Sequence, residues 1–140
     1  MYTFSSDTII ILDTEYTSWE WAQERKFSGP NEFREIIQIA AIVVDTKTFH
    51  ELDHFSIFVK PSRNPILSDF IKNLTNISQE QVDGADDFIT AIEKFRSRVG
   101  DYEIYSFGHD GLVIAENCDL NAISFPFDEK KFHDVREVFR

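Results

Sequence analysis

Residues 8–20 read TIIILDTEYTSWE and place two acids directly after an uninterrupted apolar run. The four branched aliphatic residues from Ile9 to Leu12 indicate a strand that is buried on both faces. Because side chains alternate along a strand, Asp13 and Glu15 are expected to point to the same side. Two neighbouring carboxylates repel each other, and a cation that takes oxygen ligands, such as Mg²⁺, relieves this repulsion. On spacing alone, the alternative that both acids simply leave the strand end into solvent stays open.

The composition is that of a soluble globular protein of one domain. The chain has 140 residues, of which 42% are hydrophobic and 28% charged, and 14 Phe predict a largely aromatic core. A single cysteine, Cys118, excludes an internal disulfide framework and a thiolate zinc site, and we expect it half-buried in a helix. The net charge of −11 argues against broad non-specific binding to nucleic acid. It does not exclude a nucleic-acid enzyme whose acidic pocket is neutralised by metal ions.

The sequence contains neither a signal-peptide pattern nor an apolar segment long enough to span a membrane. The first eight residues, MYTFSSDT, lack the basic start and apolar segment of a signal peptide. The longest aliphatic run, Ile36–Val44, is interrupted by Gln38 and is too short to cross a bilayer. A cytoplasmic location is therefore expected.

Three further apolar segments predict strands. Glu35–Asp45 is apolar at almost every position, which is typical of a central strand. His54–Lys60 follows after a short polar connection, so that the two form an antiparallel hairpin or meander. Glu103–Phe107 is the third of these segments, and a helix before it implies a crossover. We therefore expect it to pair in parallel with the first strand.

Two short helices are predicted between residues 68 and 83. Ser68 can cap a helix that runs towards Leu74, and residues 78–81, SQEQ, form a capping-box pattern. Asn76 lies between them, where a turn residue with positive φ is wanted, and Asn tolerates that conformation.

Longer helices complete an α/β pattern. Asp86 or Asp87 is expected to cap a helix that runs through Val99, and Gly111–Leu120 reads as a second helix. Phe132–Phe139 fits either a fifth strand or a short helix. Three strands followed by alternating helices and strands predict a mixed α/β sheet.

The connection Thr17–Phe33 is long for a compact domain and carries Trp19 and Trp21. Such loops are usually functional or mobile. The two indoles suit stacking on bases, as aromatic residues do on single strands. They suit equally well the anchoring of the loop to the body of the protein.

A third acid follows a predicted strand. Asp110 comes after the Glu103–Phe107 strand just as Asp13 comes after the first aliphatic run. If those strands are parallel neighbours, their carboxyl ends lie side by side, where α/β sheets usually place their sites. Asp13, Glu15 and Asp110 would then converge, as a ligand set for two hard metal ions that carry out phosphoryl transfer.

These motifs resemble a known family. Asp13-Thr14-Glu15 after an aliphatic strand resembles the first motif of the DEDD, or DnaQ-like, 3′-5′ exonucleases, whose fold is RNase H-like. The longer match D-x-E-x-T-x-W-E, from Asp13 to Glu20, resembles the Eri-type branch of the DEDDh exonucleases, which trims RNA 3′ ends. The segments EII (35–37), LSDF (67–70), LTNISQEQV (74–82) and SFGHD (106–110) also fit that branch. Asn76 stands where the family usually has Gly, and Phe107 where it usually has Trp.

The family's third motif has no counterpart in the sequence. It supplies a general-base His and a fourth acid, spaced H-x-x-x-x-D in this branch, whereas His133 is followed by Asp134 immediately. His50 has the wrong spacing and position. His109 adjoins Asp110, but neighbouring side chains on an extended segment diverge. We expect residues 1–140 to be one exonuclease domain that lacks its last helices, with a naturally shortened, impaired enzyme as the alternative.

The resemblance implies hydrolysis with two Mg²⁺ or Mn²⁺ ions. Asp13 would bridge both ions, Glu15 would hold the first, and Asp110 would help to hold the second. The product would be a nucleoside 5′-monophosphate released from the 3′ end. Without the third motif, we expect weak metal binding and little activity.

The resemblance also implies a site for the terminal nucleotide of a single-stranded 3′ end, with RNA favoured over DNA. The backbone around Tyr16 and Thr17 would face this nucleotide, Leu74 or Ile77 would wedge against its base, and Trp19 would help to bind it. A DNA 3′-5′ exonuclease is one alternative. The other is an impaired module of the same fold that binds nucleic acid or a protein partner.

Overall fold

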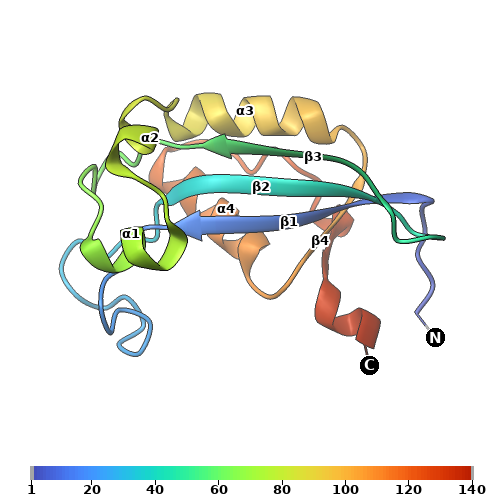
Figure 1. Cartoon of the computed structure of the whole chain (residues 1–140), viewed down its shortest axis with the longest axis horizontal. Helices are drawn as coiled ribbons and strands as arrows, with labels where there is room; N and C mark the ends of the chain where they lie inside the picture. Colours follow the sequence, from blue (N-terminus) through green and yellow to red (C-terminus); the bar gives the residue numbers. More distant parts are fainter. Residues whose placement is uncertain (1, 140) are drawn as a thin grey trace.

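A five-stranded mixed sheet forms the centre of the computed structural model, which describes residues 2–139 (Figure 1). The strand order is β3-β2-β1-β4-β5. β1 pairs antiparallel with β2, and β2 with β3, whereas β4 is parallel to β1 and β5 is parallel to β4. The strands are β1 (Thr8–Tyr16), β2 (Ile36–Asp45), β3 (Glu51–Phe58), β4 (Glu103–Ser106) and β5 (Phe132–Asp134). The predicted mixed α/β sheet and the parallel pairing of the first strand with the fourth are confirmed.

Four α-helices and two 3₁₀ turns connect and flank the strands in residues 2–139. The predicted caps are confirmed: the Ser68 hydroxyl accepts the Ile71 N–H, Ser78 opens a capping box, and Asp87 caps the long helix. The helices are α1 (Asp69–Thr75), α2 (Gln79–Asp83), α3 (Phe88–Val99) and α4 (Asp110–Leu120), and the 3₁₀ turns are Glu129–Lys131 and Val135–Phe139. Asn76 ends α1 with φ 62°, as its position in the turn predicts.

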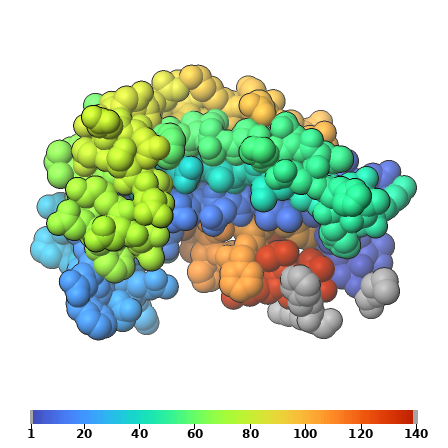
Figure 2. All heavy atoms as spheres, in the orientation of Figure 1, coloured from blue at the N-terminus to red at the C-terminus, as the bar shows by residue number. Residues whose placement is uncertain are grey.

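The main core lies between the sheet and the helices α3 and α4. Ile10, Leu12 and Ile104 of the sheet pack in one buried cluster with Phe95 of α3 and Ile114 of α4. We call this side of the sheet the helix-covered face. Because side chains alternate along a strand, the residues between these point to the opposite face. Figure 2 shows that atoms of β1 and β2 reach the surface on the side turned towards the viewer, beside the yellow-green α1–α2 segment.

Aliphatic residues contribute more to this core than predicted. Phe88 and Phe95 are buried, but Phe49 and Phe107 are exposed. Other rings pack partly buried against the core: Phe55, Phe125, Phe127 and Phe132. The branched residues of β1 and β2 fill the space next to the sheet, so many phenyl rings lie at the margin of the core.

Several boundaries differ from the predictions. β1 continues through Asp13 and Glu15, because both residues pair with β2. β3 begins at Glu51 and ends at Phe58, earlier at both ends than predicted, because pairing with β2 extends it into the polar connection. Cys118 is buried and not half-buried, because it faces the main core. The segment from residue 132 forms both predicted alternatives in turn, β5 and then a 3₁₀ turn.

Among residues 2–139, no helix combines the length and the apolar character that a crossing of the membrane requires.

Candidate active site

A pocket of about 440 Å³ lies at the carboxyl end of β1. Its acidic wall includes Asp13 and Glu15, and its apolar wall comes from the loop after β1 and from α1. The apolar wall consists of Trp19, Trp21, Phe70, Ile71 and Leu74. A carboxylate pair beside an aromatic wall can hold a cation on one side and an apolar ring on the other.

The first two acids lie on the face of the sheet that α3 and α4 do not cover. Leu12 and Thr14 are buried on the helix-covered face, so Asp13 and Glu15, which alternate with them, point to the opposite face. Asp13 is exposed and Glu15 is half-buried. The predicted common orientation of these two side chains thus follows from the observed strand.

Asp110 reaches the same region from the other side of the sheet. It is the first residue of α4 and is buried. Its Oδ1 accepts hydrogen bonds from both the hydroxyl and the backbone N–H of Thr14, the latter at 3.1 Å. This bond pair holds the carboxylate against β1 at Thr14, the residue between Asp13 and Glu15.

The pKa values of the three carboxyl groups are all raised in the folded protein, and for Glu15 and Asp110 neighbouring negative charges contribute. Although the Asp13 side chain is exposed, the protein around its carboxyl group partly desolvates it and raises its pKa above the ordinary value, against a smaller lowering by the Thr14 N–H. Burial also raises the pKa of Glu15, and the negative charges of Asp13 and Asp110 raise it further. For Asp110, burial raises the pKa most, hydrogen bonds from Thr14 lower it, and the charge of Asp13 raises it again. A cation between the three acids would stabilise their ionised forms.

The donor set fits a hard divalent cation in chemistry but is not assembled around one. All three side chains offer oxygen, which Mg²⁺ and Mn²⁺ prefer. Within residues 2–139, however, no three His, Cys, Asp or Glu side chains lie together as a ready ligand group. Asp13 and Glu15 point to one face of β1, whereas Asp110 bonds to Thr14, whose side chain lies on the other face.

The residues expected near the terminal nucleotide are divided between the pocket and the core. Tyr16, Trp19 and Leu74 line the pocket, and Leu74 is 66% exposed. Ile77 is buried in a cluster with Ile37 of β2 and is not among the residues of the pocket wall. Ile77 packs inwards because Asn76 turns the chain at the end of α1.

Thr17 is engaged in the fold and does not line the pocket. Its hydroxyl donates to the Phe33 carbonyl at 2.7 Å and accepts the Glu35 N–H at 3.0 Å. Its own N–H donates to the Glu35 carbonyl at 2.8 Å. Thr17 therefore joins the two ends of the loop that carries Trp19.

Glu35 has a role that the sequence did not reveal. Its buried carboxylate accepts the N–H groups of Ser62, Arg63 and Asn64, at 2.8, 3.0 and 2.7 Å. Through Thr17, the same residue holds the loop of the pocket. The signals in the sequence were an acid at the start of an apolar strand and the EII segment that fits the resembled branch.

The histidines that were considered as bases lie apart from the pocket wall. His133 stacks on Tyr105 with ring centroids 4.6 Å apart, and its Nε2 lies 3.6 Å from a carboxylate oxygen of Glu103. His109 precedes α4 and makes no capping hydrogen bond through its side chain. Neither residue lines the pocket.

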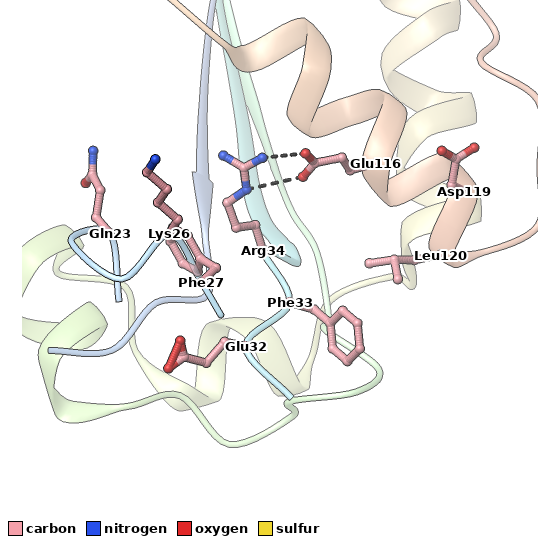
Figure 3. Close-up of a pocket in the computed structure, with 9 residues that line it drawn as sticks. All are labelled: Gln23, Lys26, Phe27, Glu32, Phe33, Arg34, Glu116, Asp119 and Leu120. Atoms are coloured by element: carbon pink, nitrogen blue, oxygen red, sulfur yellow. Dashed lines mark hydrogen bonds and ion pairs between the residues drawn. The ribbon is translucent and has the colours of Figure 1, made fainter. Parts of the chain in front are cut away.

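A second cavity, of about 540 Å³, lies between the same loop and α4 (Figure 3). Arg34 reaches across it and binds Glu116 of α4 through two nitrogen atoms. The guanidinium also lies 5.7 Å from the ring centre of Tyr16 and 5.5 Å from that of Phe27. This ion pair and these rings attach the far end of the loop to the body of the protein.

The chain is similar to exonucleases over most of its length. The exonuclease family model RNase T matches residues 10–135. Human 3′-5′ exoribonuclease 1 is 32% identical over 144 residues, which cover 95% of this chain and 39% of the human protein. The probable 3′-5′ exonuclease KapD of Bacillus subtilis is 30% identical, over 88% of this chain and 58% of that protein. The chain thus spans about two fifths of the length of the human relative.

Solved structures show the same fold. The nuclease domain of 3′hExo, a DEDDh family member solved with rAMP bound, superposes with a TM-score of 0.81 at 30% identity, over 96% of this chain and 70% of that domain. Product-bound exonuclease I, at 16% identity and a TM-score of 0.68, is similar in fold alone. Both comparisons confirm the predicted RNase H-like sheet. Together with the match over residues 10–135, they show that the chain belongs to the RNase T exonuclease family and has DEDDh 3′-5′ exonucleases as its relatives.

Proposed function

We propose that this chain acts on single-stranded 3′ ends, preferably of RNA, and releases nucleoside 5′-monophosphates by metal-dependent hydrolysis. The observation that carries the proposal is the pocket in which Asp13 and Glu15 face an apolar wall with Leu74, while Asp110 adds its charge. Exonucleases of the DEDDh type depend on metal ions. The preference for RNA rests on the relatives, among them exoribonucleases and a 3′-exonuclease solved in recognition of a histone mRNA stem-loop.

In this proposal Asp13, Glu15 and Asp110 hold Mg²⁺ or Mn²⁺, for which a carboxylate-only donor set is suited. When bound, the ions supply charge neutralisation at the phosphate and an activated water. Thr14 keeps Asp110 against β1. Trp19 and Leu74 of the apolar wall orient the terminal base.

Hydrolysis of an RNA labelled at its 3′ end tests the proposal. We expect labelled mononucleotide to appear with Mg²⁺ or Mn²⁺ and to disappear with EDTA or with Asp13→Asn. Turnover should be slow compared with human 3′-5′ exoribonuclease 1, because the sequence has no His in an H-x-x-x-x-D motif. A positioned general base contributes roughly 10²–10⁴ in rate. Turnover at the rate of the human enzyme would contradict the second expectation.

The same experiment distinguishes the enzyme from a non-catalytic module of this fold that binds nucleic acid. Such a module would bind RNA equally well with Mg²⁺, with EDTA and after Asp13→Asn, and would release no mononucleotide. The enzyme would lose activity under both of the last two conditions.

A further inference from the structure

Trp21 combines two unfavourable features beside the acidic pocket. Its side chain is 65% exposed although indole is largely apolar, and its φ is 66°. A non-glycine residue in this left-handed region costs roughly 1–2 kcal/mol. Neither the exposed indole nor this backbone conformation stabilises the fold. Trp21 lines the same pocket as Asp13 and Glu15. Strained residues of this kind gather where ligands bind.

The backbone turn around Trp21 is held by contacts that do not involve the indole. The next residue, Ala22, is fully buried and donates its N–H to the Trp19 carbonyl at 2.9 Å. The Ala22 carbonyl accepts the Phe27 N–H at 2.8 Å. The fold thus presents the indole on a turn that is stable without it.

An ion pair braces the same turn. Arg25 binds Glu32 with its Nε, at 2.5 and 3.0 Å from the two carboxylate oxygens. Its Nη1 donates to the Glu20 carbonyl at 3.0 Å, directly before Trp21, and its N–H donates to the Trp21 carbonyl at 3.2 Å. Arg25 therefore holds the backbone carbonyls of Glu20 and Trp21, and with them the turn that presents the indole.

The charges around the indole decide what it can bind. Glu20 and Glu24 line the pocket on either side of Trp21 in the sequence. They repel a phosphate but not the neutral face of a nucleobase. Within residues 2–139, no other aromatic ring stacks on Trp21, and the exposed face of its indole is available for stacking. Every base has such a face, and stacking on an aromatic side chain is tolerant of sequence.

We propose that Trp21 forms a second stacking subsite, for a base upstream of the 3′-terminal nucleotide. This inference rests on the proposed function, in which Leu74 and Trp19 contact the terminal base. It extends the footprint of the pocket from one nucleotide to at least two. The subsite binds through stacking and not through phosphate contacts, so its contribution is insensitive to salt.

Equilibrium binding of r(AAAA) and of AMP to the full chain tests the subsite, with Ca²⁺ in place of Mg²⁺ to slow hydrolysis. We expect Trp21→Ala to weaken r(AAAA) binding by roughly 5- to 150-fold and to leave AMP binding unchanged. Trp21→Phe should restore most of the loss, and the loss should be equal at low and high salt. Tyr102→Ala is the matched control, because Tyr102 is an exposed aromatic residue just before β4, at the other end of the sheet.

The outcomes separate this inference from the proposed function. Equal r(AAAA) affinity of Trp21→Ala and the unmodified chain overturns the subsite and leaves the function intact. An equal loss for r(AAAA) and AMP places Trp21 at the terminal base and overturns the assignment to a second nucleotide. If the unmodified chain binds neither ligand, the proposed function fails and the subsite with it.

Discussion

Thr14 donates two hydrogen bonds to a single oxygen of Asp110, one from its hydroxyl and one from its backbone N–H at 3.1 Å. Both residues are buried, and they are 96 positions apart in the chain. The contact ties β1 to the first turn of α4, next to the acids of the pocket. It explains how a carboxylate on the helix-covered side of the sheet is kept beside two carboxylates on the other side.

Thr14→Val should therefore lower the free energy of unfolding. Valine keeps the shape of threonine but removes a buried hydrogen bond to a charged group, which is worth roughly 1.5–3 kcal/mol. Thr14→Ser, which keeps the hydroxyl, should retain most of this stability. Urea unfolding without divalent ions measures both variants. Equal midpoints for Thr14→Val and the unmodified chain would show that the contact contributes nothing.

Asp13→Asn should separate activity from stability. We expect activity to fall by at least ~100-fold, since even groups around metal ligands contribute 10–100-fold. The free energy of unfolding in EDTA should rise, because one of the repelling charges that raise the pKa of Glu15 is removed. Chemical unfolding and the release of 3′ label measure the two effects. A variant that loses stability as well as activity would contradict the repulsion argument.

The three acids should make the metal-free protein less stable as the pH rises. Loss of hydration, complete or partial, is the main cause for each and raises the pKa of Asp13, Glu15 and Asp110 in the folded protein. Between the unfolded and the folded pKa values, the folded protein binds more protons than the unfolded chain. The contribution of these groups to stability is therefore greatest below their unfolded pKa, and it is lost as pH rises through the folded pKa.

Divalent ions should reverse this dependence. Because ligands must be deprotonated, Mn²⁺ binding should tighten as the pH rises through the same window and should release protons. Calorimetry in two buffers of different ionisation enthalpy measures the protons released. Asp87, whose pKa is lowered mainly by the Thr90 N–H, provides an internal contrast, since its stabilising contribution is lost in acid. Mn²⁺ affinity that is independent of pH would contradict the assignment of the ligands.

Asn76→Ala should cost stability at the end of α1. Asn76 has φ 62°, and a residue with an ordinary Cβ pays about 1 kcal/mol there. Asn76→Gly should be neutral or stabilising, because glycine carries no such penalty. Asn73→Ala is the matched control, since Asn73 lies within α1 and alanine is the better helix former. Urea unfolding of the three variants decides the order.

Local patterns sufficed for much of the fold. The caps at Ser68 and Asp87 and the left-handed Asn76 each depend on residues within a few positions, so they could be predicted. The exact reach of a strand depends on its partner. β1 extends through Glu15 only because β2 continues beside it. Burial of Cys118 likewise depends on which side of α4 meets the core.

The sequence by itself determined that two acids share one face of a buried strand, because alternation along β1 is a property of the backbone. It also determined that a third acid follows a parallel neighbour. Only the tertiary structure decided that Asp110 approaches from the helix-covered side, that Ile77 faces the core, and that Glu35 holds the loop of the pocket. Each of these contacts joins segments far apart in the chain, and the packing of α1 and α4 against the sheet sets their directions. Local preferences carry no information about such directions.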